Sequence, residues 1–170
     1  SISQIVSFTS ISPKVVEKEM IEAGYESSTA RIIASLGYNF DDSIDIANGE
    51  FYNDVATMLI DIFEMIADYS GSSILYFKEN GNWIFADNEI SELFLSLMIQ
   101  LQKDILNYQA GDSHFIFTDQ INTISALAQL KPKNRLIDEL EHMLALKGRS
   151  RSYINLRLAY DNLLYNLERR

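Results

Sequence analysis

Two long stretches repeat their apolar residues at three- and four-residue spacing, and this period constrains the fold more than any other feature. One runs from about Phe51 to Tyr69, and the other begins after Asp87 or Asn88 and ends near Gly111. Residues spaced in this way lie on one side of a helix and are buried against neighbouring elements. The chain is therefore predicted to be mainly α, with its core built around two long amphipathic helices.

Start and stop residues mark shorter helices. Ser12 is a suitable N-cap, Pro13 suits the first helical position, and Gly24 stands where a helix ends. Further helices are predicted at 27–36, 119–130, 135–146 and from 152 to near the end of the chain. Turn residues and three aspartates predict a loop over 38–48, with a short extended piece at 44–46.

One segment departs from the helical period. Ser73–Phe77 and Trp83–Phe85 are rich in aromatic and β-branched residues, and Asn80-Gly81 stands between them. This pattern is typical of a β-hairpin with a type I′ turn, in which both turn residues take φ > 0. His114–Phe117 can add a third short strand. The predicted fold is an α-rich α+β multi-helix bundle with a small hairpin, forming a single globular domain over residues 1–170.

Composition and motifs exclude several kinds of chemistry. The chain has no cysteine, which removes disulfides, thiolate metal sites and cysteine nucleophiles. No apolar run reaches the ~18–20 residues of a membrane span, and the first ten residues lack a signal-peptide pattern. The sequence therefore predicts a soluble, cytoplasmic protein without membrane insertion.

No catalytic motif is present. The sequence contains neither a Gly-x-Ser-x-Gly elbow nor a glycine-rich phosphate loop. Acidic residues at helical spacing, such as Asp54 and Asp61, can bind a hard cation, but His114 and His142 stand outside any Glu-x-x-His motif. No catalytic residue, cofactor or metal ligand is predicted. Enzymatic activity is left open, with a non-enzymatic role preferred.

Charge is distributed unevenly along the chain. The net charge is −10, yet residues 32–77 hold eight acids and no Lys or Arg, while residues 131–170 hold nine basic residues against five acids. An acidic surface steers an oppositely charged partner toward it. The predicted partner-binding face consists of Asp41, Asp42, Asp45, Asp54, Asp61, Glu64 and Asp68.

A nucleic-acid interface is the alternative interpretation. Basic residues near tyrosines are typical of surfaces that hold single strands. That surface would comprise Lys131, Lys133, Arg135, Lys147, Arg149 and Arg151. The first two predicted helices also have a helix-turn-helix outline, in which the start of the second helix contacts bases. The contacting residues would be Ser27, Ser28, Thr29 and Arg31, although four glutamates surround the turn where phosphate contacts require cations.

These features favour a small acidic interaction module. Its partner is predicted to be a protein, which it would bind as an inhibitor, an immunity-type protein or a regulatory subunit. The alternative is a nucleic-acid-associated accessory or regulatory domain. A homo-oligomer is compatible with the sequence.

Overall fold

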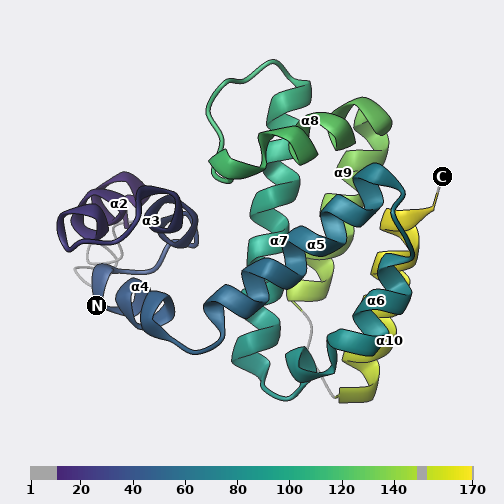
Figure 1. Cartoon of the computed structure of the whole chain (residues 1–170), viewed down its shortest axis with the longest axis horizontal. Helices are drawn as coiled ribbons and strands as arrows, with labels where there is room; N and C mark the ends of the chain where they lie inside the picture. Colours follow the sequence, from purple (N-terminus) through teal and green to yellow (C-terminus); the bar gives the residue numbers. More distant parts are fainter. Residues whose placement is uncertain (1–10, 149–152, 170) are drawn as a thin grey trace, which may run out of the picture. The chain divides into compact units, whose positions relative to one another are not determined.

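The computed structural model describes residues 11–148 and 153–169, and this part of the chain is entirely helical (Figure 1). It contains nine α-helices, α2 to α10, two short 3-10 helices, η1 and η2, and no strand within those ranges. The described residues up to Gly49 form one compact unit and those from Glu50 onward form a second.

The first unit is a three-helix cluster. Helices α2 (Pro13–Glu22), α3 (Ser27–Ala34) and α4 (Phe40–Asn48) contact one another. Their buried side chains include Val16, Met20, Ala30, Ile33 and Ala34. Because α2 and α3 present these residues at three- and four-residue spacing, the two helices were predictable from the sequence.

Helix α4 replaces the loop predicted over residues 38–48. Asn39 is its N-cap and accepts a hydrogen bond from the Asp42 amide at 2.8 Å. Asp41 and Asp42 occupy the first turn, where negative charge interacts favourably with the helix dipole. Two of the three aspartates that suggested a loop thus lie in the first turn of a helix, and the extended piece predicted at 44–46 is wrong.

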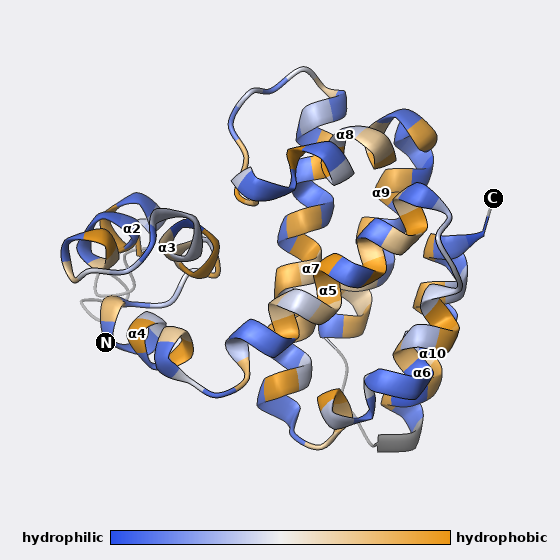
Figure 2. Ribbon diagram, viewed as in Figure 1, coloured by the Kyte–Doolittle hydropathy of each residue, from blue (hydrophilic) through white to orange (hydrophobic). Residues whose placement is uncertain are grey.

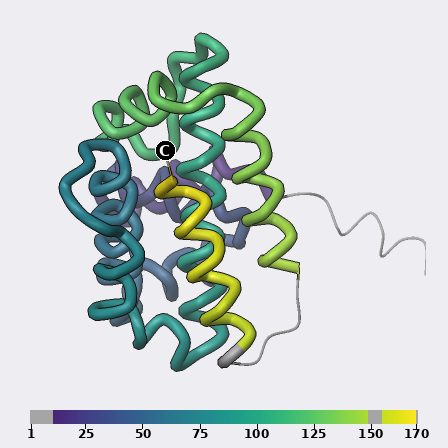
Figure 3. Tube along the Cα trace, turned by 90° about the vertical axis from the view of Figure 1, so that its right-hand side faces the viewer, coloured from purple at the N-terminus to yellow at the C-terminus, as the bar shows by residue number. Residues whose placement is uncertain are grey.

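The second unit surrounds the long helix α7 (Asn88–Gln109). Helix α7 contacts α5 (Tyr52–Asp68), α8 (Ile121–Leu130) and α9 (Lys133–Lys147). Both α5 and α7 are apolar where they cross (Figure 2). Helix α10 (Tyr153–Glu168) contacts both α9 and α6 (Ser73–Asn80), and it runs between them in Figure 3.

The predicted hairpin is wrong, because residues 73–80 form helix α6 and residues 82–85 form η1. Ser72 is the N-cap of α6, and its hydroxyl accepts a hydrogen bond from the Leu75 amide at 3.2 Å. Gly81 has φ −107°, so the turn lacks the positive φ of type I′. Glycine is required here for space, since a Cβ at this position would lie 2.5 Å from the Phe77 ring.

An aromatic cluster explains why this segment folds as it does. The rings of Phe77, Phe85, Phe94 and Tyr160 lie with centroids 5.6–5.9 Å apart in the pairs that contact. They come from α6, η1, α7 and α10, and all four side chains are buried. The aromatic residues that suggested a strand are therefore the contacts that hold a helix against the bundle.

The third strand predicted at His114–Phe117 is also wrong. This segment is a loop that leads into η2 (Thr118–Gln120). The amides of Ile116 and Phe117 donate hydrogen bonds to the carboxylate of Asp104 on α7 at 2.7–3.0 Å. A side chain thus satisfies the backbone donors that a neighbouring strand would have bonded.

Candidate functional site

The predicted acidic face divides between the two units. Asp41, Asp42 and Asp45 are exposed on α4, in the first unit. The remaining four carboxylates, those of Asp54, Asp61, Glu64 and Asp68, lie on α5 in the second unit. The predicted face therefore consists of two smaller acidic sets, one on α4 and one on α5.

Two of the α5 carboxylates make local hydrogen bonds. Asp61 accepts a hydrogen bond of 2.9 Å from the hydroxyl of Tyr76 on α6, and Asp68 accepts one of 2.9 Å from the Ser70 amide. Burial, the hydrogen bond to Asp61 and the charge of that carboxylate raise the pKa of Tyr76 above its ordinary value. Tyr76 is therefore protonated at neutral pH, and its hydroxyl donates a hydrogen bond to Asp61.

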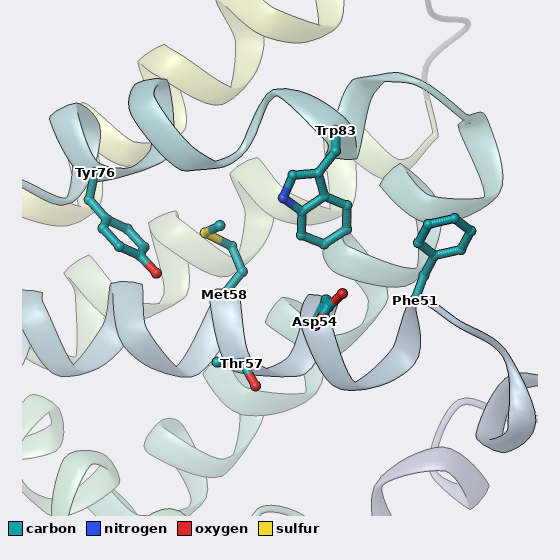
Figure 4. A pocket seen from close by; sticks show the side chains of 6 residues that line it. All are labelled: Phe51, Asp54, Thr57, Met58, Tyr76 and Trp83. Atoms are coloured by element: carbon teal, nitrogen blue, oxygen red, sulfur yellow. The ribbon is translucent and has the colours of Figure 1, made fainter.

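A groove opens beside the first half of α5. It measures about 330 Å³ and lies between α5 and the α6–η1 segment. Its lining residues are Phe51, Asp54, Thr57, Met58, Tyr76 and Trp83, and we call it the aromatic groove. Figure 4 shows three rings along the groove, with Asp54 and Thr57 on α5 beneath them.

The position of the indole in this groove is fixed. The Trp83 ring nitrogen donates to the Asn80 carbonyl at 2.8 Å, at the point where α6 ends. Phe51 lies just before α5 and is 45% exposed, whereas Met58 is buried beneath the rings. The groove thus offers apolar ring surface next to a carboxylate, an arrangement suited to a ligand that is both flat and cationic.

Two members of the predicted basic surface, Lys131 and Arg135, make contacts within the bundle. Lys131 is 4% exposed, and its ammonium contacts a Glu139 carboxylate oxygen at 2.8 Å and the Leu167 carbonyl at 2.9 Å. Arg135 bonds the same Glu139 oxygen at 3.2 Å and also donates to backbone carbonyls at the end of α10. The buried Lys131 and the half-buried Arg135 therefore both join α9 to the end of α10.

These residues form what we call the polar junction, made of Gln102, Lys131, Arg135 and Glu139. Gln102 on α7 donates to Glu139 at 3.0 Å and to the Leu136 carbonyl at 3.0 Å. Burial lowers the pKa of Lys131; the charge of Glu139 opposes this shift and that of Arg135 adds to it. The junction ties α7, α9, the end of α8 and the end of α10 together.

Two of the four remaining basic residues, Lys133 and Lys147, lie in the described part of the chain, and they lie apart from each other. Lys133 and Lys147 are exposed at opposite ends of α9, while Arg149 and Arg151 lie outside the described residues. A surface of Lys133, Lys147 and their neighbours therefore stays a prediction.

The predicted helix-turn-helix readers all lie in α3, in the first unit. Arg31 is 3.7 Å from Glu17 on α2, and the Ser28 hydroxyl donates to Glu26 at 2.6 Å. Ser27 and Thr29 lie in the first turn of the same helix. The acids around the turn thus contact two of the four predicted readers directly.

Neither a metal cluster nor a membrane span is found in the described ranges. No group of three or more histidine, aspartate or glutamate residues there is arranged to hold a metal ion. Likewise, none of the helices in those ranges combines the length and apolarity that a bilayer span requires.

The aromatic groove was not predicted from the sequence. The hairpin prediction placed Tyr76 and Trp83 on strands, so it could not bring them to α5. The available signal was the four-residue spacing from Ser73 to Phe77 behind a Ser72 N-cap, which also fits a helix.

Exposed apolar side chains recur at seven-residue spacing on each of the last two helices. On α9, Ile137 is 37% and Leu144 46% exposed; on α10, Leu158 is 63% and Tyr165 60% exposed. Each pair is separated by seven residues, which is about two helical turns, so its members lie on one side of their helix. We call these four residues the apolar stripes.

In its described residues the second unit is thus an all-helical bundle that carries exposed apolar side chains on two adjoining helices. Residues 83–169 match the family model for the C-terminal part of the delta subunit of DNA polymerase III. The match covers half of the chain, and the chain belongs to this family.

The chain is also similar to another subunit of DNA polymerase III. The chain is 19% identical over 166 residues to DNA polymerase III subunit delta′ of Bacillus subtilis (strain 168). The alignment covers 97% of the chain and 50% of that protein, so the chain spans about half the length of the relative it matches. No solved structure matches the chain.

Proposed function

We propose that the chain is the protein-interacting part of a clamp-loader-related DNA polymerase III subunit, and that it associates with other subunits of that assembly. Family membership supports a role within a multi-subunit polymerase. The observation that carries the proposal is the pair of apolar stripes, which lie inside the family-matched region on α9 and α10. Large apolar side chains that stay exposed along one side of a helix are suited to a contact with another protein.

A charge placed in a stripe should break this contact. We expect Leu158→Asp and Tyr165→Asp each to weaken co-purification with the other DNA polymerase III subunits of the same organism by at least about tenfold, because each would bury an unpaired carboxylate. Asn122→Asp is the matched control, since it adds the same charge at an exposed polar position on α8, a helix that carries neither stripe. Stripe variants that co-purify as well as the unmodified chain would contradict the proposal.

The acidic sets on α4 and α5 are a second element of the proposal. They would steer a basic partner surface and so affect the association rate more than the lifetime of the complex. Replacing Asp54, Asp61 and Asp68 together by Asn should slow association and reduce its dependence on salt. Neutralising Lys133 and Lys147 instead tests the nucleic-acid alternative, in which each lost phosphate contact lowers the log–log salt slope by about one.

A further inference from the structure

The aromatic groove differs in chemistry from the apolar stripes. We propose that it binds an arginine side chain presented by a protein partner. The assignment to a protein rests on the proposed function, whereas the preference for arginine rests on the groove alone. Three properties of the groove support that preference: its rings, its charge and its preformed geometry.

The rings offer faces on which a planar cation can stack. Phe51 is nearly half exposed, and Trp83 and Tyr76 are partly exposed beside it in the groove. A cation within ~6 Å of a ring centroid is attracted by the ring quadrupole, most strongly for tryptophan. A guanidinium also stacks flat on a ring, which an ammonium cannot do. The same segment already shows such a pair, because the Arg157 guanidinium lies 5.6 Å from the Phe85 centroid.

The charge of the groove selects a cation over an anion or a neutral apolar group. Asp54 lines the groove and is exposed, and its carboxylate makes no ion pair with any residue that the structure describes. Asp61 lies about two turns further along α5 and accepts a hydrogen bond from the Tyr76 hydroxyl. Residues 32–77 contain no Lys or Arg, so no cation from this stretch of sequence competes for the site. A phosphate group would be repelled by these carboxylates.

The groove is formed before any ligand arrives. Trp83 is held by the Asn80 carbonyl at 2.8 Å, and Tyr76 by Asp61 at 2.9 Å. Because both rings are fixed, little conformational entropy is lost on binding. The volume of about 330 Å³ lies at the small end of the ~300–1,000 Å³ range of ligand sites, which suits one long side chain.

Trp83 makes the test direct, since it is the chain's one tryptophan and lines the groove. The full chain is titrated with three capped tripeptides, Gly-Arg-Gly, Gly-Lys-Gly and Gly-citrulline-Gly, while tryptophan fluorescence is recorded. Citrulline has the shape of arginine without its charge. We expect a saturable change with the arginine peptide and at least about fivefold weaker binding of the citrulline peptide.

Other outcomes would overturn the proposal. Equal binding of arginine and citrulline peptides would show that charge is not recognised. Equal binding of arginine and lysine peptides would remove the role of the planar guanidinium. A fluorescence signal that does not change with any peptide would mean that the groove is not the site.

Variants then assign the binding to the groove. Asp54→Asn should weaken binding of the arginine peptide by about fivefold without changing binding of the citrulline peptide. Glu64→Gln is the matched control, because it removes an exposed carboxylate from the same helix outside the groove lining. Equal losses in both variants would reduce the effect to general charge and overturn the site.

The two proposals fail separately. Co-purification of the apolar-stripe variants tests assembly and does not involve peptides, while the fluorescence titration tests the groove without other subunits. If Leu158→Asp loses assembly but binds the arginine peptide as the unmodified chain does, the apolar stripes and the aromatic groove are two separate binding surfaces. An arginine titration that fails in the unmodified chain would remove the groove proposal and leave the assembly proposal intact.

Discussion

Two carboxylates are buried in the second unit, and they are stabilised in different ways. Asp104 on α7 is 1% exposed and accepts hydrogen bonds from the backbone amides of Ile116 and Phe117. Glu139 on α9 is 4% exposed and accepts from the side chains of Gln102, Lys131 and Arg135. The Asp104 carboxylate holds a loop, whereas the Glu139 carboxylate is the centre of the polar junction.

The difference separates two ways of burying charge. Backbone amides are dipoles without net charge, so removing Asp104 leaves polar groups unsatisfied. Lys131 and Arg135 are ions, so removing Glu139 leaves charge without its counter-ion in a dry environment, which costs more. Glu139 also organises cations that bond the last carbonyls of α10, so its effect should extend to that helix.

The largest effect is expected from Glu139→Leu. The variant leaves Lys131 buried beside Arg135, and loss of one partner of a buried pair costs about 3–5 kcal/mol. Urea denaturation followed by far-ultraviolet circular dichroism measures the change in the free energy of unfolding.

The control for this variant is Glu141→Leu, an exposed position on the same helix, which should change stability by no more than about 0.5 kcal/mol. Similar losses in both variants would mean that Glu139 stabilises α9 alone, without the cations.

A smaller loss is expected from Asp104→Asn. The amide keeps one oxygen acceptor but turns a donor toward the amides of Ile116 and Phe117, so we expect a loss of about 1–3 kcal/mol. Hydrogen exchange should show faster exchange at these two amides and little change at the end of α10. Increased exchange in α10 would contradict the separation between the two carboxylates.

Much of this architecture was predictable, because helical periodicity depends on which residues are apolar. Helices α5 and α7 were predicted from their apolar spacing alone. The period was less informative in short segments, where Asn80-Gly81 suited a turn between strands as well as a helix end. The structure decides between them through the contact of Gly81 with the Phe77 ring.

The candidate sites were harder to predict, since a residue type does not reveal its partner. Spacing correctly placed Asp54 and Asp61 on one helix. Lys131 also looked like a surface cation, yet Glu139 and the end of α10 hold it in the interior, with Arg135 half-buried beside it. Contacts between residues more than thirty positions apart, such as Lys131 with Leu167, leave no local pattern in the sequence.

A double variant tests whether the charges of the polar junction are coupled. Lys131→Met combined with Glu139→Leu removes both buried charges and fills their space with apolar atoms. It should cost no more than about 2 kcal/mol, less than Glu139→Leu alone, because no unpaired ammonium remains. The lowered pKa of Lys131 supports this, since burial outweighs the attraction of Glu139 there. A double variant as unstable as the sum of its singles would show that the two residues are not coupled.

The smallest expected effect concerns alkaline pH. There Lys131, the partner of Glu139, titrates, whereas the backbone amides bonded to Asp104 do not. Because burial lowers the pKa of Lys131 in the folded state, the unfolded chain binds more protons between that value and the ordinary pKa of 10.5. The free energy of unfolding contributed by this residue therefore rises with pH as 10.5 is approached.

The same pH range contains an opposite contribution from Tyr52. Burial raises the pKa of Tyr52 to about 12, which favours the folded state below pH 10 and loses that stability as pH rises from 10 to 12. Denaturation at pH 7, 8.5 and 10, compared between the unmodified chain and Lys131→Met, cancels this shared contribution. The unmodified chain should gain stability relative to Lys131→Met as pH rises, and Asp104→Asn should keep that gain because backbone amides do not titrate. A difference that stays constant or reverses would mean that Glu139 holds the Lys131 proton at least as strongly as burial expels it, and the low cost expected for the double variant would then lose its basis.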